Sequence, residues 1–372
     1  MNILLISPSI DPKRGGQERH VSNLAYFLKN NGNNVTIIVA DKYKPKNFDI
    51  NIVYINSFKI LGLPIIDIKS YYAFCRNGNF DICHLHYETL FGEIILFINK
   101  LLKLPTIITL HSQIIRTLPM KFLLDQFSLI IINIFSDNII CLSLSLAYEL
   151  RKRGLCMSKI LIIPNAIKIP SLEEKMQTEL SQNNSNNTDL LFVGRLEERK
   201  GIKILIKSMI YLKNKGKKIN LKVVGRGPLD GEIKKMIREN DLSSSILMMG
   251  YISDNELIQC YSSTKSVVIP SYYEGVPGVA LEALAYNKFL IGSDIPGLRE
   301  LIFPNQNGFI VKPGDILSLA DAIESSLENK IDKINNIELN KKIIKNFNWE
   351  NIVNKIEFAY KKVLEKKRSI IL

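Results

Sequence analysis

Short apolar segments with the character of buried strands alternate with helix-like segments along most of this chain, and this alternation strongly constrains its fold. Repeated strand–helix units predict an α/β fold with a parallel sheet, because parallel strands need crossover connections. The expected strands are Ile3–Ile6, Val35–Val39, Ile82–Leu85, Thr106–Leu110, Ile139–Leu142 and Ile160–Ile163 in a first series, and Leu190–Val193, Leu221–Val224, Ile246–Met249, Ser266–Ile269 and Phe289–Ile291 in a second.

An Asn- and Ser-rich stretch lies between the two series of strands. Residues 177–188 offer almost no apolar side chain to bury, as in segments that connect domains. At 372 residues the chain also exceeds an ordinary single domain. We therefore expect two doubly wound domains, residues 1–170 and 190–348, with residues 171–189 as the linker. The expected helices include Phe91–Leu102, Met120–Phe135, Ser145–Gly154 and the amphipathic tail Trp349–Lys367.

The composition indicates a folded protein with reduced thiols. Hydrophobic residues make up 46% of the chain, and the five cysteines show no paired spacing, which favours a cytoplasmic location. Residues 1–7 lack a basic n-region and are typical of a first strand, not of a signal peptide. The net charge of +13 is spread over both halves, so it predicts anionic substrates or an anionic membrane surface and no nucleic-acid partner.

The turn after the strand Ser266–Ile269 carries two carboxylates. Glu274 lies in a Gly- and Pro-marked loop, and Glu282 follows eight positions later in a helix-like segment. Free amides at a helix start bind phosphates or hydroxyls, and open α/β sheets bind ligands at this end of their strands. Two carboxylates beside an anion site accept hydrogen bonds from neutral hydroxyls, such as those of a sugar and a ribose. The amides expected to contribute are those of Gly275, Val276, Gly278 and Val279.

Residues 270–284, in which two Glu residues are separated by seven others, closely resemble the signature of the retaining GT-B glycosyltransferases of family four (glycosyl transferases group 1). The resemblance implies two Rossmann-like domains facing across a cleft, with a C-terminal helix, residues 349–372, that crosses back to the first domain. It also implies that Glu274 contacts the donor sugar and that Glu282 holds the ribose hydroxyls. Pro277 has no N–H to donate, which marks a subfamily of the pattern.

Two further turns of the second series match the same family. Arg195 follows the first strand and Lys200 begins the next helical segment, where two cations can neutralise a diphosphate. The turn at Gly225 lacks the third glycine of a dinucleotide fingerprint but resembles the family's Gly-x-Gly-Pro turn in the nucleotide pocket. Tyr251 and Ile252 correspond to the segment that contacts the base. A purely structural turn is the alternative at these positions.

The first series supplies glycines and histidines. Gly15 and Gly16 lie after the first strand, where backbone can approach a ligand closely, and they resemble the family's loop over the donor phosphate. His111 ends a strand in a Thr-Leu-His sequence that matches the family's sugar-contacting histidine. The resemblance thus assigns catalytic roles to His111, Glu274, Arg195 and Lys200.

The other histidines leave alternatives open. His84 and His86 share one face of a strand end, and they could ligate a metal with Cys83 and His111, although the spacing matches no established ligand pattern. Otherwise they line an acceptor cleft or have a structural role. His20 has no assigned function. We expect no metal, because the chain contains no Asp-x-Asp, the usual metal-holding signature of the other large transferase fold. We also expect no cofactor, because the nucleotide-sugar that the resemblance implies is a substrate.

The sequence therefore predicts a glycosyltransferase that moves a sugar from a nucleotide-diphosphate-sugar to a glycan or lipid-linked acceptor with retention, in cell-surface polysaccharide or lipopolysaccharide synthesis. The rival interpretations are an epimerase or phosphorylase on the same fold and a binding protein without turnover. Peripheral contact with an anionic membrane is a further hypothesis. It rests on the basic charge and on the apolar segments Phe91–Leu104 and Leu118–Phe135. The alternative for these two segments is that they are buried helices of the first domain.

Overall fold

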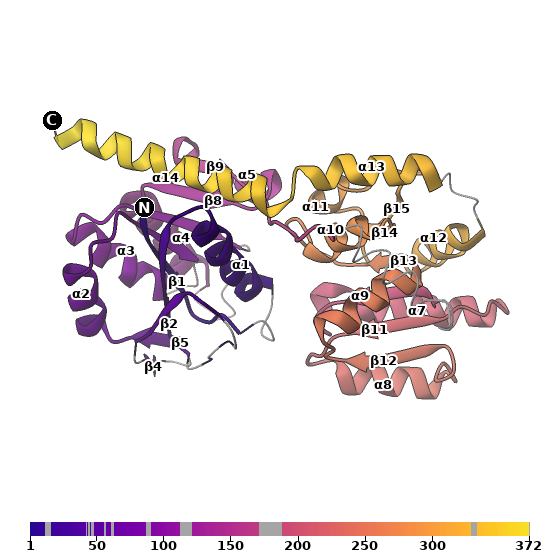
Figure 1. Cartoon of the computed structure of the whole chain (residues 1–372). Helices are drawn as coiled ribbons and strands as arrows, with labels where there is room; N and C mark the ends of the chain where they lie inside the picture. The colour runs from indigo at the N-terminus through magenta and orange to yellow at the C-terminus, as the bar shows by residue number, and fades with distance from the viewer. Residues whose placement is uncertain are drawn as a thin grey trace. The chain divides into compact units, whose positions relative to one another are not determined.

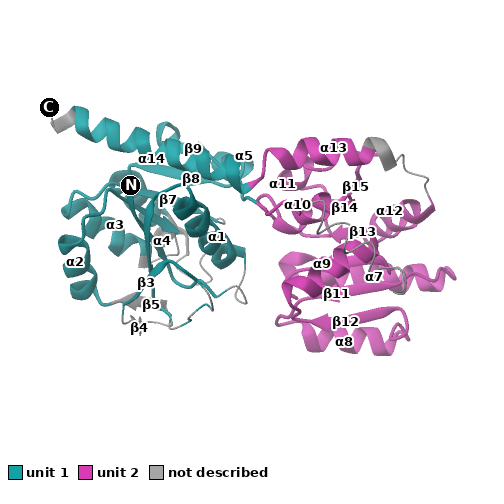
Figure 2. Cartoon of the chain, viewed as in Figure 1, with its two compact units in different colours: residues 1–166, 349–372 teal, residues 167–348 magenta. Residues whose placement is uncertain are grey.

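The computed structural model describes residues 1–11, 16–41, 43, 45, 48–55, 57–60, 63–86, 91–111, 121–170, 188–328 and 333–371. The chain divides into two compact units, residues 1–166 with 349–372 and residues 167–348 (Figure 2). Each unit has a parallel sheet with helices packed against it, so the expected α/β class is confirmed (Figure 1).

The sheet of the first unit contains seven parallel strands in the order β3-β2-β1-β6-β7-β8-β9. Its strands are β1 (Asn2–Ser7), β2 (Asn34–Val39), β3 (Asn51–Tyr54), β6 (Ile82–His86), β7 (Thr106–Leu110), β8 (Asn138–Cys141) and β9 (Ile160–Ile162). An antiparallel hairpin, β4 (Ser57–Ile60) with β5 (Leu63–Ile66), stands apart from it. The order in which strands are added reverses between β1 and β6, which is the doubly wound pattern.

Helices cover both faces of this sheet. They are α1 (Gly16–Asn30), α2 (Ile68–Asn77), α3 (Phe91–Leu101), α4 (Lys121–Phe135), α5 (Leu144–Lys152), the short η1 (Met157–Lys159) and α14 (Trp349–Ile371). Leu4 and Ile6 share a core with α2, α3, α4 and α5, whereas Ile3 and Leu5 share a second core with α1 and α14. Alternate residues of β1 therefore enter opposite cores, as the two-residue period of a strand requires.

The second unit has a six-stranded sheet in the order β12-β11-β10-β13-β14-β15. Its strands are β10 (Thr188–Val193), β11 (Leu221–Val224), β12 (Ile246–Gly250), β13 (Thr264–Ile269), β14 (Phe289–Ser293) and β15 (Gly308–Val311). Its helices are η3 (Glu198–Lys200), α7 (Ile202–Asn214), α8 (Asp230–Glu239), α9 (Asp254–Ser263), α10 (Gly278–Ala285), α11 (Pro296–Arg299), α12 (Ile316–Glu328) and α13 (Lys333–Lys345). All neighbouring strands are parallel, and the order reverses between β10 and β13.

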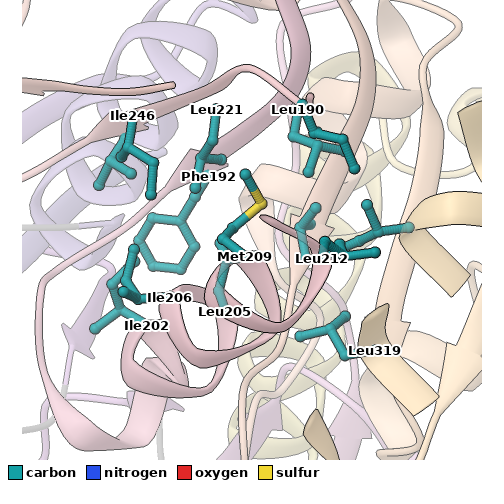
Figure 3. Packing of buried hydrophobic residues seen from close by; sticks show 14 of the residues in the cluster. Leu190, Phe192, Ile202, Leu205, Ile206, Met209, Leu212, Leu221, Ile246 and Leu319 are labelled. Atoms are coloured by element: carbon teal, nitrogen blue, oxygen red, sulfur yellow. The ribbon is translucent and has the colours of Figure 1, made fainter. Parts of the chain in front are cut away.

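Two cores hold the helices of this unit to its sheet. On one face, α7 places its apolar stripe against Phe192, Leu221 and Ile246 of three adjacent strands (Figure 3). On the other face, Leu191 packs with the α9, α10, α11 and α13 helices. Each fully buried Leu or Ile contributes roughly 1.5–3 kcal/mol, so these contacts fix the strand-to-helix turns at the sheet edge.

Three details differ from the sequence-based expectations. Ile167 belongs to the second unit, because its side chain lies in that core and its N–H donates to the Phe347 carbonyl at 2.9 Å. Strand β10 begins at Thr188, inside the expected linker, whose residues 171–187 lie outside the described part of the chain. The edge strands β3 and β15 were not predicted.

Among the helices that the structure describes, none is long and apolar enough to cross a membrane.

Candidate active site

Two loops of the second unit meet where its strand order reverses. The first follows β10 and contains Arg195 and Lys200, and the second follows β13 and contains Glu274. The Tyr272 N–H donates to the Arg199 carbonyl at 2.9 Å. Gly201 has a φ of +69°, and a Cβ there would overlap the carbonyl oxygen of Pro270. Only glycine combines that backbone conformation with this close approach, so the two loops are locked together.

Lys200 and Glu274 form an ion pair across these loops. The Lys200 ammonium donates to Glu274 Oε1, and the two side chains are 21% and 10% exposed. The hydroxyl of Ser271 donates to the same carboxylate oxygen at 2.9 Å. A cation and an anion are thus held together at the carboxyl end of the sheet, where α/β proteins bind ligands.

Arg195 occupies a different position from Lys200. Its side chain is 64% exposed, and its Nε lies 3.6 Å from Glu197 Oε2. The two predicted diphosphate-binding cations share one loop, yet each contacts its own carboxylate. A pair this exposed contributes at most about 1 kcal/mol, so Arg195 can exchange Glu197 for a ligand at little cost.

The start of α10 offers backbone donors beside this pair. Gly278 is the first residue of the helix, so its N–H has no intrahelical acceptor. A Cβ at Gly275 or Gly278 would meet no atom within 4 Å, so space is open at both. The side chain of Val276 is buried and that of Val279 packs against the core, which leaves only their backbone groups for a ligand.

Glu282 lies within α10 and is held by a tyrosine that was not predicted. The Tyr261 hydroxyl donates to Glu282 Oε2 at 2.6 Å. The Tyr261 ring is buried and stacks on Tyr286, with 5.7 Å between the ring centroids. Glu282 is therefore oriented from α9, one helix away in the sequence.

Gly225 has a structural role in this unit. Its φ is +132°, its N–H donates to the Gly250 carbonyl at 2.7 Å, and a Cβ there would overlap the carbonyl oxygen of Gly194. The structural alternative for this turn thus has direct geometric support. Tyr251 is 43% exposed after β12, whereas Ile252 packs against the core.

The four histidines of the first unit lie together near the carboxyl ends of the strands β6 and β7. His86 Nδ1 lies 2.9 Å from His111 Nε2, and His84 contacts the Tyr360 hydroxyl at 2.6 Å and the Thr109 hydroxyl at 2.7 Å. His20 lies among them, with its ring centroid 5.2 Å from that of His111. Gly16 begins α1 in open space, and Gly15 lies outside the described residues.

These imidazoles are neutral at physiological pH. Burial lowers the pKa of His20 to about 4, and burial together with the charge of His20 lowers the pKa of His84 to about 3. Burial is also the main cause that lowers the pKa of His86 and His111. Across the described residues there is no cluster of three His, Cys, Asp or Glu side chains with the geometry of a metal site.

Sequence reasoning missed the residues that support the predicted ones. Ser271, Tyr261 and Tyr360 are neutral side chains, and nothing in the local sequence distinguishes them from core or surface residues. His20 did carry a signal, because it is four positions before Leu24 on the apolar side of α1. A histidine on a buried helix face needs neighbours that accept a neutral imidazole, and here those neighbours are the other histidines.

Comparison with known proteins agrees with this geometry. Residues 14–169 match the family model of Glycosyltransferase Family 4, and residues 174–347 match that of Glycosyl transferases group 1. An uncharacterised glycosyltransferase of Methanocaldococcus jannaschii is 26% identical over 364 residues, which cover 96% of this chain and 98% of the relative. Phosphatidyl-myo-inositol mannosyltransferase of Mycobacterium leprae is 22% identical over 382 residues, 98% of this chain and 97% of the relative.

The fold is also shared with solved structures. HepE of Anabaena, in complex with UDP-glucose, has a TM-score of 0.82 at 17% identity, covering 97% of this chain and 100% of that one. The two parallel-sheet domains and these matches define a protein of GT-B fold. The chain belongs to the family 4 glycosyltransferases, the glycosyl transferases group 1. Sugar transfer is accordingly its class of activity, in place of the epimerase, phosphorylase and binding-protein alternatives.

Proposed function

We propose that this glycosyltransferase moves a sugar from a nucleotide-diphosphate-sugar to a glycan or lipid-linked glycan, with retention of anomeric configuration. The observation that carries the proposal is the Lys200–Glu274 pair at the strand-order reversal of the second unit, next to open space at Gly275 and Gly278. A cation, a carboxylate and helix-start amides meet there, which suits a diphosphate joined to a sugar.

Each residue has a separate part in the proposed reaction. Lys200, Arg195 and the α10 amides hold the diphosphate, whose negative charge increases as the bond to the sugar breaks. Glu274 accepts a hydrogen bond from a sugar hydroxyl, and Glu282 accepts from the ribose. His111 contacts a sugar hydroxyl as a neutral imidazole.

The bond changes balance without a covalent enzyme intermediate. The bond between the anomeric carbon and the diphosphate oxygen breaks, and the acceptor oxygen bonds to the same face of that carbon. The acceptor's proton leaves with the diphosphate. Because the stabilising charges are already in place, the protein contributes mainly preorganised electrostatics.

A panel of nucleotide-sugars tests the donor assignment. UDP-glucose is the first compound to try, because HepE was solved with it. A true donor should raise the thermal unfolding midpoint, since a ligand that binds only the folded state stabilises it. It should also yield a glycosylated product whose anomeric configuration NMR can assign. No shift and no product from uridine, guanosine and adenosine diphosphate sugars would refute the donor class.

Metal independence is a separate part of the proposal. In the proposed site, Lys200, Arg195 and the α10 amides neutralise the diphosphate, which is the task that a divalent cation would otherwise perform. Transfer should therefore continue in excess chelator. Activity that disappears in chelator and returns with manganese would contradict this part while leaving the donor assignment intact.

The acceptor and pathway are proposed from the relatives. The M. leprae relative is named for mannosyl transfer to a phosphatidylinositol, which is a lipid acceptor. We propose a lipid-linked or polymeric glycan of the cell surface as the acceptor class. Transfer to a lipid-linked oligosaccharide, compared with transfer to free monosaccharides and water, measures this preference directly.

A further inference from the structure

Helices α3 and α4 of the first unit expose five large apolar side chains. The two helices pack against each other (Figure 1). The rings of Phe97 and Phe135 meet edge to face, with 5.8 Å between their centroids. We define the α3–α4 face by its exposed members, which are Phe97, Leu101, Phe127, Ile130 and Ile134, at 51%, 62%, 59%, 54% and 55% exposure.

This face is distinct from the side of the same helices that builds the core. Ile95 and Ile98 on α3, and Leu129 and Ile132 on α4, are buried against the sheet. A surface helix normally turns polar residues to water, but residues 126–135 contain no charged side chain at all. Soluble proteins rarely expose contiguous apolar patches of this kind unless something binds them.

Cations border one end of the α3–α4 face. Lys100 and Lys103 are exposed at the end of α3, and Lys159 donates to the Ser136 carbonyl at 2.7 Å, directly after α4. The end of α14 reaches the same place, because Lys367 lies 3.4 Å from Asp137. Residues 361–368 carry five basic side chains and one acidic one.

We propose that the α3–α4 face lies on an anionic membrane surface, with the five apolar side chains among the lipid chains and the lysines at the headgroups. An apolar helix face with flanking cations is the pattern of an interfacial helix. Lys and Arg side chains near an anionic surface are attracted to it, so charge and apolar burial act together. The alternative of burial as helices holds for one side of each helix, and the membrane contact is our proposal for the exposed apolar side.

A second copy of the chain is the competing occupant, and charge disfavours it. Two molecules that each carry a net charge of +13 repel as they approach, whereas an anionic lipid surface attracts them. The apolar area alone does not distinguish the two occupants. The lysines at one end of the α3–α4 face favour the anionic lipid surface.

Co-sedimentation with vesicles tests the proposal and requires no sugar donor, so it is independent of the proposed transfer reaction. The full chain is mixed with vesicles of equal parts phosphatidylcholine and phosphatidylglycerol, or of phosphatidylcholine alone. We expect binding to the anionic vesicles that weakens as salt is raised. Phe127→Gln with Ile134→Gln should lower the partition coefficient by about tenfold, because two exposed apolar groups no longer enter the bilayer.

Matched substitutions complete the experiment. Leu317→Gln in α12 removes an equally exposed apolar group from the second unit and should leave binding unchanged. Lys100→Gln with Lys103→Gln should weaken binding most at low salt, whereas Lys235→Gln, exposed on α8, should not. Wild-type protein that stays in the supernatant at low salt overturns the proposal. So does a wild-type dimer without lipid that Phe127→Gln with Ile134→Gln converts to a monomer, because the face would then bind a second copy.

Discussion

Lys200 and Glu274, which are 74 positions apart in the sequence, form a mostly buried ion pair to which Ser271 adds a hydrogen bond at 2.9 Å. Both partners also belong to the proposed donor site. A diphosphate that binds Lys200 must therefore share the ammonium with Glu274 or displace it, which couples the cation that holds the leaving group to the carboxylate that holds the sugar.

The first prediction concerns the loss of the cation. Lys200→Ala leaves Glu274 with its charge only partly compensated, so we expect lower stability, by about 1–3 kcal/mol, together with loss of diphosphate binding and of turnover. Lys203→Ala is the matched control, because Lys203 pairs with Glu198 and Glu232 at the surface. Denaturant unfolding and nucleotide titration measure both effects. If Lys203→Ala cost as much stability as Lys200→Ala, burial of the Lys200 pair would not be the cause.

The second prediction concerns the carboxylate. Glu274→Gln keeps the shape and the acceptor oxygen but removes the negative charge that competes for Lys200. Nucleoside diphosphate should bind about three- to tenfold more tightly, roughly 0.7–1.4 kcal/mol, while transfer slows because the sugar hydroxyl loses its charged acceptor. Calorimetric titration and turnover at saturating donor separate the two. Weaker diphosphate binding in Glu274→Gln would show that the pair does not compete with the ligand.

The Lys200–Glu274 contact also shows where sequence reasoning stopped. The strand–loop–helix pattern around each residue was sufficient to place both at the carboxyl ends of strands. Their contact depends on β10 lying beside β13, and the local pattern of neither strand specifies its neighbour in the sheet. From sequence, Lys200 and Glu274 were therefore assigned to separate parts of the donor, and the coupling between them was missed.

The third prediction concerns the ribose assignment. Glu282→Ala should weaken nucleotide binding by roughly 1.5–3 kcal/mol, the usual worth of a hydrogen bond to a charged group. Tyr261→Phe keeps the buried ring but removes the hydroxyl that orients Glu282, so a smaller loss of roughly 0.5–1.5 kcal/mol is expected. Tyr211→Phe on α7 is the control. Unchanged affinity in Glu282→Ala would rule out the ribose contact, whatever Tyr261→Phe does.

The first unit was less predictable than the second for a physical reason. Its edge strand β3 is short and only partly buried, so it lacks the continuous apolar run that identified the central strands. The histidine cluster combines residues of α1, β6, the end of β7 and, through Tyr360, α14. Such a cluster is visible only after the sheet order is known.

The fourth prediction is a dependence of stability on pH. Burial lowers the pKa of His20 to about 4 and that of His84 to about 3. The unfolded chain binds protons to these residues below about pH 6.5, whereas the folded chain does not until much lower pH, so stability falls as pH drops through this window. At about pH 5, a histidine whose pKa in the folded chain is about 4 lowers the stability of the fold by roughly 2 kcal/mol. Unfolding followed between neutral and mildly acid pH should show a shallower slope in His20→Gln than in the wild type.

The fifth prediction is that His86 determines which ring nitrogen of His111 carries the proton. The two rings are joined at 2.9 Å through His86 Nδ1 and His111 Nε2, and the buried Nε2 of His86 has no partner among the described residues. A buried N–H without an acceptor is rarer than an unpaired acceptor atom, so we place the proton of His86 on Nδ1, where it is donated to His111. His111 then keeps its own proton on Nδ1 and can donate it to a sugar oxygen.

This arrangement predicts different results for two substitutions of His86. His86→Asn retains a polar atom near the position of Nδ1 and should keep most of the turnover, whereas His86→Phe removes the donor and should slow transfer about tenfold, the equivalent of roughly 1.4 kcal/mol. Diphosphate affinity should be unchanged in both, because the proposed nucleotide contacts belong to the second unit. Nitrogen NMR of the imidazoles should show the Nδ1–H form of His111 in the wild type and a mixture in His86→Phe. An unaltered His111 tautomer in His86→Phe would mean that His86 does not position it, even if turnover falls.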